Sequence, residues 1–376
     1  MRENASTRAG RILKWSFAIA IGIAVAGFLF AWSGAYNVAA SRGHWAIVEW
    51  ALRFGMRNSV ELRAPTSAPM LLDDPDLVRL GAAHFEVSCA FCHGSPERKV
   101  NLVTDKMLPA PPSLSTEMRP WKDGELFWIV RHGIKYTGMP GWVALERDDE
   151  VWAVVAFLRA LPTLDKARYR DLAFGGSPAV PNIESAARES PAELGTLVCA
   201  RCHGSEGIGP ASDLVPTLHG QPAAFLAAAL RSYANGKRRS GIMAPLVADL
   251  EAADIARLAR YYAGLAPLPP EDPVTPDANP VARGELLATT GDPAAGVPPC
   301  IACHGRDALD TYPRLAGQNA AYMKGQLQLW KAGHNTAGDG AAIMAPIARQ
   351  LSDPDIDAVT SFFAGRPPEA AKATPP

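Results

Sequence analysis

The sequence predicts an all-α protein, in which three small helical domains follow one another behind an N-terminal transmembrane helix. An uncharged apolar run extends from Trp15 to Trp32, and about 18 such residues are just enough to cross a bilayer as a helix. The rest of the chain holds three units of similar outline. Each opens with a short helix and closes with a longer one whose apolar residues recur at helical spacing.

The N-terminal segment is flanked by positive charge on one side only. The basic residues that precede the apolar run are Arg2, Arg8, Arg11 and Lys14. The positive-inside rule therefore leaves the N-terminus in the cytoplasm and exports the chain after Trp32. The alternative is a cleaved signal peptide with a small-residue site at Val38-Ala39-Ala40. Both interpretations place the remaining chain outside the cytoplasm.

Composition shifts and turn-rich stretches divide the 376 residues into eight segments. These are a cytoplasmic stub and transmembrane anchor (1–40), a juxtamembrane helix and linker (41–65), unit 1 (66–165), a linker (166–186), unit 2 (187–268), a Pro-rich linker (269–280), unit 3 (281–367) and a tail (368–376). The aromatic-rich helix expected over 43–58 has two possible places, the membrane surface or the side of unit 1. The closing helices of units 1 and 3 are expected to begin near Asp148 and after an N-cap at Ser352.

Units 2 and 3 are internal repeats of each other. Matching residues are 101 positions apart at the pairs Cys199/Cys300 and Met243/Met344. Between these two points they are 97 positions apart, as in the pairs Pro216/Pro313 and Gln221/Gln318. Unit 1 shares the outline but not this internal pattern. Unit 3 also carries an extra stretch, Thr289 to Pro299, which we expect to interrupt its first helix.

Every cysteine in the chain belongs to a Cys-x-x-Cys-His motif. The three motifs are Cys89-Ala-Phe-Cys92-His93, Cys199-Ala-Arg-Cys202-His203 and Cys300-Ile-Ala-Cys303-His304. In this motif two thiols add to the vinyl groups of one haem, and the histidine supplies the proximal nitrogen to iron. The sequence therefore predicts three covalently attached haem c groups. A disulfide framework would leave the histidines unexplained, a zinc site needs two nearby pairs, and a thioredoxin-like motif needs a βαβ pattern.

A methionine beside a proline follows each motif, and we expect it to be the second axial ligand. Met139 lies 46 positions after His93, whereas Met243 and Met344 each lie 40 positions after their histidine. A thioether raises the reduction potential of haem and occupies the last coordination position, so three such irons would carry electrons and do little catalysis. A lone methionine more often packs in a core.

Several other residues offer alternatives to this assignment or have polar side chains near the motifs. Met107 and Met118 compete for the ligand position in unit 1, and a second histidine ligand is a further alternative. We expect His84 to face solvent or a haem propionate. Arg201 and the run Lys237-Arg238-Arg239 are expected to be solvated, or else to form a basic rim for an acidic partner.

At these residues the chain resembles the class I cytochromes c. Residues 190–366 look like the tandem-domain diheme periplasmic cytochromes c, through CARCHGSEGIGP, PTLHGQ and DIARLARYYAG with their partners CIACHG, PRLAGQ and IMAPIARQLSDPDI. Residues 70–165 resemble class I domains of respiratory-complex subunits, through CAFCHGSP and DDEVWAVVAFLRALP. The resemblance implies all-α haem domains with His/Met ligation. A third domain and an anchor depart from the diheme pattern.

These observations predict an electron relay in the bacterial cytoplasmic membrane, with its haem domains in the periplasm. Its expected partners are a donor dehydrogenase or quinol-oxidising complex, and an acceptor oxidase or soluble cytochrome. The alternatives are a triheme subunit of a membrane dehydrogenase that oxidises alcohols or sugars, a haem peroxidase and a haem-based sensor. A balance of 37 basic and 38 acidic residues does not suggest nucleic-acid binding.

Overall fold

The computed structural model describes residues 2–116, 121–175, 195–208, 212–265, 278–334, 337 and 340–368. Over these ranges the fold is helical and contains no β-strand, although one antiparallel bridge joins Asp292 to Val297. The prediction of an all-α protein is confirmed. The expected Pro-rich linker (269–280) and the second half of the 166–186 linker lie mostly outside the described residues.

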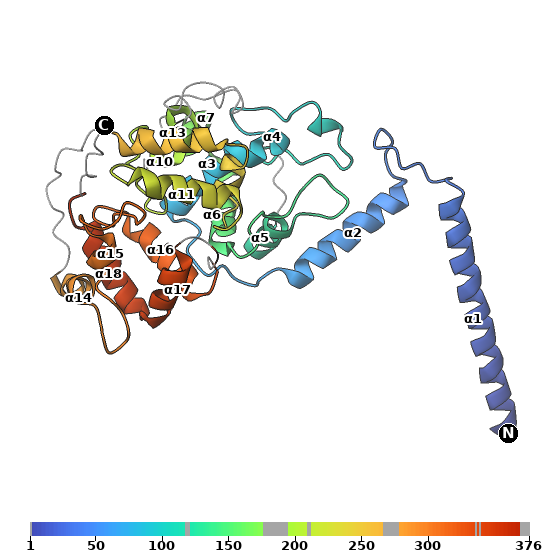
Figure 1. The fold of residues 1–376 in the computed structure, drawn as a ribbon. Helices are drawn as coiled ribbons and strands as arrows, with labels where there is room; N and C mark the ends of the chain where they lie inside the picture. Colours follow the sequence, from blue (N-terminus) through green and yellow to red (C-terminus); the bar gives the residue numbers. More distant parts are fainter. Residues whose placement is uncertain are drawn as a thin grey trace.

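Two N-terminal helices precede the globular part (Figure 1). They are α1 (Arg2–Trp32) and α2 (Ala46–Arg63). Residues Gly10–Trp32 of α1 have a mean hydropathy of 2.0, and none of the most apolar part is buried. In α2 only Val60 is buried, whereas Trp50 and Phe54 remain 60 % and 58 % exposed. Most of α2 therefore does not pack on unit 1.

The helices of unit 1 are organised around α6. They are α3 (Pro75–His84), a π-helical turn (Phe85–Cys89), α4 (Ala90–His93), a 3₁₀ turn (Thr104–Lys106), α5 (Asp123–His132), α6 (Asp148–Ala160) and a second 3₁₀ turn (Leu161–Thr163). Every residue of α6 from Glu150 to Leu158 is buried. At Gly81 of α3 an added Cβ would lie 2.0 Å from the carbonyl oxygen of Ala153, so glycine is required for α3 and α6 to approach.

Units 2 and 3 have comparable sets of helices. Unit 2 contains a π-helical turn (Gly195–Cys199), α10 (Ala200–His203), α11 (Ala223–Ala234), α12 (Met243–Val247) and α13 (Ala252–Ala263). Unit 3 contains α14 (Ala278–Thr289), α15 (Ile301–His304), α16 (Ala320–Lys331), α17 (Ala341–Gln350) and α18 (Asp353–Ala364). Gly284 brings α14 against α18 as Gly81 brings α3 against α6, because its added Cβ would lie 2.2 Å from the Ala358 carbonyl oxygen.

Local signals placed several helix ends correctly. Helix α6 begins at Asp148. The Ser352 hydroxyl caps α18 by accepting from the backbone N–H of Asp355 at 3.2 Å. The first helix of unit 3 ends at Thr289 and the motif helix α15 begins at Ile301, so the expected interruption is present.

One local expectation differs from the structure. The segment expected to be a linker after residue 165 begins with a helix, α7 (Lys166–Phe174). Tyr169, Leu172 and Phe174 of α7 are buried in the core cluster that also contains Phe85 and Phe157, so burial of these apolar residues stabilises the helix.

A pseudo-two-fold relation connects units 2 and 3. Gln221 of unit 2 donates from Nε2 to the Arg314 carbonyl at 2.8 Å and accepts from the Arg314 N–H at 3.0 Å. Gln318 of unit 3, the repeat partner of Gln221, makes the same pair of bonds with Thr217, at 2.9 and 2.8 Å. Thr217 and Arg314 are themselves 97 positions apart, so each unit presents the same surface to the other, as in an isologous dimer.

Candidate haem-attachment sites

Each Cys-x-x-Cys-His motif forms a single helical turn. The three turns are α4, α10 and α15, and each begins immediately after the first cysteine of its motif. One turn of helix brings the first cysteine and the histidine, four residues apart, to the same side. In unit 1 the turn ends at Gly94, whose φ of 67° is readily adopted only by glycine.

The three motif histidines share one hydrogen bond. The Nδ1 atoms of His93, His203 and His304 each lie 2.9 Å from a proline carbonyl oxygen, that of Pro112, Pro216 and Pro313 respectively. A carbonyl can only accept, so Nδ1 must carry the proton and Nε2 must keep its lone pair. This is the tautomer that a metal-binding imidazole needs, with its orientation set by an outer partner.

None of the six cysteines forms a disulfide, which contradicts the disulfide alternative. Burial raises the pKa of Cys89 and Cys202 to about 12 and the pKa of Cys199 and Cys300 to about 11. Redox-active thiols have a lowered pKa instead. Two thiols and one oriented imidazole on the same turn are the donors that covalent haem attachment requires, so the residues present fit haem c.

The three predicted methionine ligands lie in different local structures. Met139 lies in the loop between α5 and α6, where its carbonyl accepts from the N–H of Ile134 at 3.2 Å. Met243 begins the short helix α12, and Met344 lies within α17, which continues through Pro346. The proline beside Met344 therefore does not end the helix. Met344 contacts the core cluster that also includes Cys300.

The competitor Met107 lies beside the Met139 loop. A Cβ added to Gly138 would lie 2.0 Å from Met107 Cε and 3.3 Å from its Sδ. The thioether of Met107 is therefore in contact with the residue that precedes Met139. Unit 1 brings two methionines to one place, and the assignment of Met139 as the ligand stays a prediction.

His84 and Arg201 are buried rather than exposed to solvent, and Arg238 is partly buried. His84 is 5 % exposed, and its ring lies 4.8 Å from that of Trp142. Arg201 is also 5 % exposed and lies over the ring of Phe174 in α7. Arg238 donates to Tyr322 and Gln326 in unit 3. Arg201 is covered by α7 and Arg238 by unit 3, whereas His84 is covered by Trp142 of its own unit.

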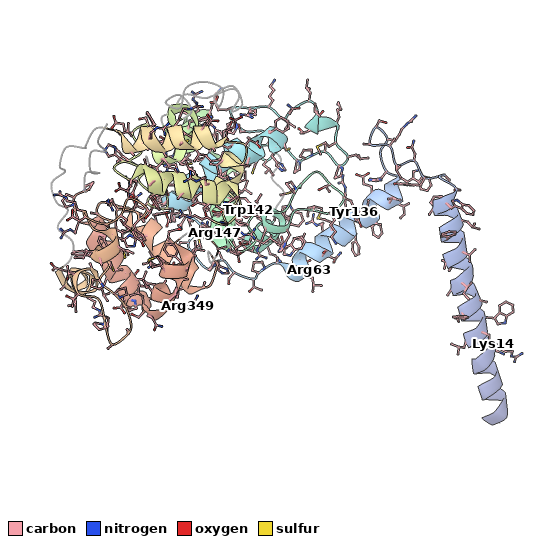
Figure 2. All side chains as sticks on the ribbon, in the orientation of Figure 1. Lys14, Arg63, Tyr136, Trp142, Arg147 and Arg349 are labelled. Carbon is pink, nitrogen blue, oxygen red and sulfur yellow. The ribbon has the colours of Figure 1, made fainter. Side chains whose placement is uncertain are left out.

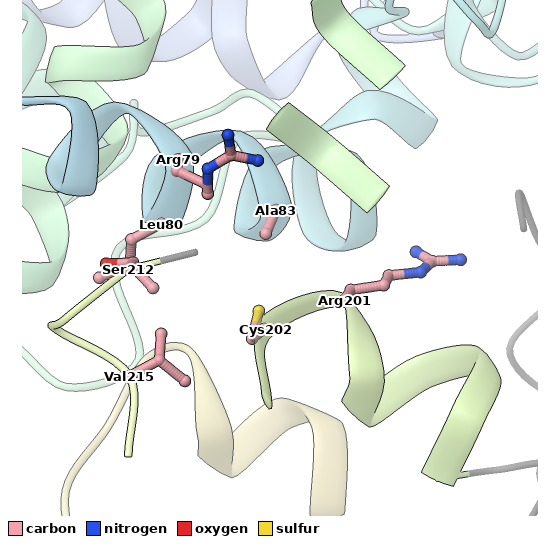
Figure 3. A pocket seen from close by; sticks show the side chains of 7 residues that line it. All are labelled: Arg79, Leu80, Ala83, Arg201, Cys202, Ser212 and Val215. Atoms are coloured by element: carbon pink, nitrogen blue, oxygen red, sulfur yellow. The ribbon is translucent and has the colours of Figure 1, made fainter. Parts of the chain in front are cut away.

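Helix α3 of unit 1 covers the attachment motif of unit 2. Figure 3 shows Cys202 directed toward α3 near Ala83, whereas Arg201 extends away from Cys202. Arg79, Leu80 and Ala83 of α3 line one small cavity with Cys202 and Ser212, and the Ser212 hydroxyl donates to the Asp76 carbonyl at 3.2 Å. The second site is therefore built from two units.

The carbonyl partners of the histidines were missed from the sequence. A signal was available, because Pro216 and Pro313 are a matched pair in the repeat. Pro112 carried no such signal, since unit 1 lacks the internal pattern.

The chain matches the sequence model of a known family. The family is described as cytochrome c oxidase, cbb3-type, subunit III, and it matches residues 76–158 and 186–261. These two stretches contain the first and second Cys-x-x-Cys-His motifs.

Among known proteins, the chain is similar to two electron-transfer cytochromes. It is 36 % identical to the thiosulfate dehydrogenase electron acceptor of Thiomonas intermedia, over 46 % of this chain and 81 % of that protein. It is 34 % identical to cytochrome c4 of Pseudomonas aeruginosa, over 45 % of this chain and 83 % of that protein. The crystal structure of reduced recombinant cytochrome c4 from Pseudomonas stutzeri covers 50 % of this chain and 100 % of its own, with 27 % identity and a TM-score of 0.41. The chain belongs to the class I c-type cytochromes, and it is an electron carrier that uses haem c.

Proposed function

We infer that this chain is a triheme electron carrier, held by α1 at the periplasmic face of the bacterial cytoplasmic membrane. The observation that carries the haem count is the histidine hydrogen bond, which is repeated at all three motifs with the same 2.9 Å distance. A motif that had lost its haem function would have no reason to keep the imidazole in this tautomer.

The protein's own residues account for the chemistry expected of a carrier. The cysteines hold each haem, the histidine offers Nε2 to its iron, and the proline carbonyl keeps that nitrogen unprotonated. When bound, haem supplies one-electron redox chemistry. A methionine at the opposite position, as we propose for Met139, Met243 and Met344, raises the potential and leaves no open position for oxygen or peroxide.

The haem count has a direct test. We expect the purified protein to contain three haems per chain, and the double variant Cys300→Ala/Cys303→Ala to contain two. The matched variant Cys89→Ala/Cys92→Ala should also contain two. A native content of two haems, unchanged by the substitutions in unit 3, would contradict the triheme proposal. A high-spin haem in the native spectrum would favour a peroxidase instead.

The membrane proposal rests on the exposure of α1 and α2. Helix α1 is apolar and unburied over Gly10–Trp32. Trp45, which precedes α2, and Trp50 and Phe54 within α2 are exposed, and the Trp45 ring lies 6.1 Å from that of Phe30 in α1. Aromatic residues of this kind settle at the membrane surface. We expect the mature protein to retain Met1–Trp32 by intact mass and to require detergent for extraction. A mature N-terminus near Ala40 would show a cleaved signal peptide.

A second candidate is the electron-accepting partner of a dehydrogenase. It is favoured by the 36 % identity to a protein named as a thiosulfate dehydrogenase electron acceptor. In that case a dehydrogenase should co-purify with this chain, and should reduce it directly. Reduction only by a quinol-oxidising complex would favour the general respiratory relay.

A further inference from the structure

A buried carboxylate of unit 1 holds the segment of unit 2 that leads into Met243. Glu150, in the first turn of α6, is 3 % exposed. It accepts hydrogen bonds from the Ser240 hydroxyl at 2.6 Å, from the Gly241 N–H at 2.6 Å and from Trp142 Nε1 at 3.2 Å. Arg147 Nη1 lies 2.8 Å from Glu150 Oε1, the oxygen that also accepts from Ser240, and its positive charge balances that of the carboxylate. Figure 2 shows Arg147 and Trp142 close together in the middle of the globular part.

The contact extends to Met243 through Ser240. The Ser240 hydroxyl donates its single proton to Glu150, so its lone pairs are free to accept from the Met243 N–H at 2.9 Å. Arg147 also donates to the Arg239 carbonyl at 2.9 Å. Unit 1 therefore holds the backbone at residues 239, 240 and 241, immediately before the proposed ligand.

The matching segment of unit 3 lacks the residues that make these contacts. With the offset of 101, Ser240 and Gly241 correspond to Ala341 and Ala342 in unit 3. Alanine has no hydroxyl to connect a carboxylate to the methionine N–H. At Gly241 a Cβ would also lie 2.2 Å from Trp142 Nε1, so alanine would not fit against unit 1.

The acid of unit 3 at the matching place serves another purpose. Asp355 precedes Ile356 in the first turn of α18, as Glu150 precedes Val151 in α6. Its carboxylate accepts from Ser352 at 2.7 Å and from Arg283 at 2.8 Å, both within unit 3. Only the acid of unit 1, among these two, reaches into a neighbouring unit.

We propose that Glu150 is a positioning residue for Met243, so that the docking of unit 1 determines how the thioether is presented at the second haem. This deepens the proposed function and rests on Met243 being an axial ligand. The physical reason is that a short buried segment with three fixed points cannot rotate as an exposed loop would. Loss of the carboxylate would release the Ser240 hydroxyl, and with it the Met243 backbone.

The test uses the haem-loaded full chain in detergent and the methyl resonance that an iron-bound methionine gives in reduced cytochromes. The variants Met139→Ala, Met243→Ala and Met344→Ala assign the three resonances by loss of one each. We expect both Glu150→Gln and Ser240→Ala to shift the Met243 resonance and to leave the other two in place. The double variant should shift it no further than the larger single change, because the two residues act in one chain of contacts.

Two controls keep the outcomes distinct. Glu146→Gln weakens an outer ion pair with Arg239 at the same interface, and Asp355→Asn removes the matching acid of unit 3. Neither should move the Met243 resonance. If the Met243 resonance does not move in Glu150→Gln and Ser240→Ala, Glu150 only holds the units together. The positioning inference is then wrong, while the ligand assignment of Met243 stands. An unchanged spectrum in Met243→Ala would overturn the ligand assignment and the inference together.

Discussion

The paired glutamines between units 2 and 3 allow the energy of this interface to be measured. In Gln221→Ala the N–H and carbonyl of Arg314 lose their partner in a region where Gln221 is 5 % exposed. Leaving a buried polar group unsatisfied costs about 1–3 kcal/mol. With partial rescue by water at one of the two groups, we expect a loss of about 2–4 kcal/mol.

The location of the effect is as informative as its size. Gln221→Ala should accelerate hydrogen exchange at the Arg314 amide, and Gln318→Ala should do so at the Thr217 amide. At 1.4 kcal/mol per factor of ten, exchange should rise by about 30-fold to several hundredfold. Gln328→Ala, an exposed position on α16, should change neither amide. Acceleration below about threefold at both amides would refute the reasoning.

Three further predictions follow from the same structure. Burial lowers the pKa of His84 from 6.5 to about 4, so between these pH values the unfolded chain binds a proton at His84 and the folded chain does not. Stability should fall by about 3 kcal/mol as pH drops from 6.5 to 4, and urea titrations of His84→Leu should lack this slope. Gly284→Ala should destabilise unit 3 by about 1–3 kcal/mol because α14 and α18 have no room for a Cβ, whereas Gly55→Ala in exposed α2 should be neutral or stabilising in the same thermal scans. Met139→Ala should change the spectrum of the first haem and Met107→Ala should not, and the reverse result would make Met107 the ligand.

The helical class could be predicted, and the candidate attachment sites could be proposed, because their signals are local. A Cys-x-x-Cys-His motif carries its chemistry within five residues, and one helical turn then places the first cysteine and the histidine together. The cap at Ser352 and the start of α6 at Asp148 also depend only on neighbouring residues. The matched pair Gln221 and Gln318 was visible in the repeat, although its hydrogen bonds between units 2 and 3 were not.

The predictions that failed concern residues whose surroundings come from distant parts of the chain. Arg201 is a charged residue inside a motif and was expected to be solvated or to form a basic rim, yet it lies over Phe174 of α7. His84 was expected to face solvent or a haem propionate, because its own helix gives no sign of Trp142, which lies 58 positions further along the chain. Local periodicity shows which face of a helix is apolar, but not which neighbouring unit covers a polar residue.

By itself, the sequence determined three Cys-x-x-Cys-His motifs, an all-α architecture, the repeat of units 2 and 3, and an apolar helix long enough for a membrane. These properties depend on residue type and on the order of residues along the chain. Only the tertiary structure decided the proline partners of the histidines, the exchange between Gln221 and Gln318, and the contact from Glu150 to Ser240. The physical reason is that the glutamine and glutamate contacts join residues 90 to 101 positions apart and form only where buried polar groups of packed units must satisfy one another. The histidine–proline contacts depend on how the following loop folds back on each motif.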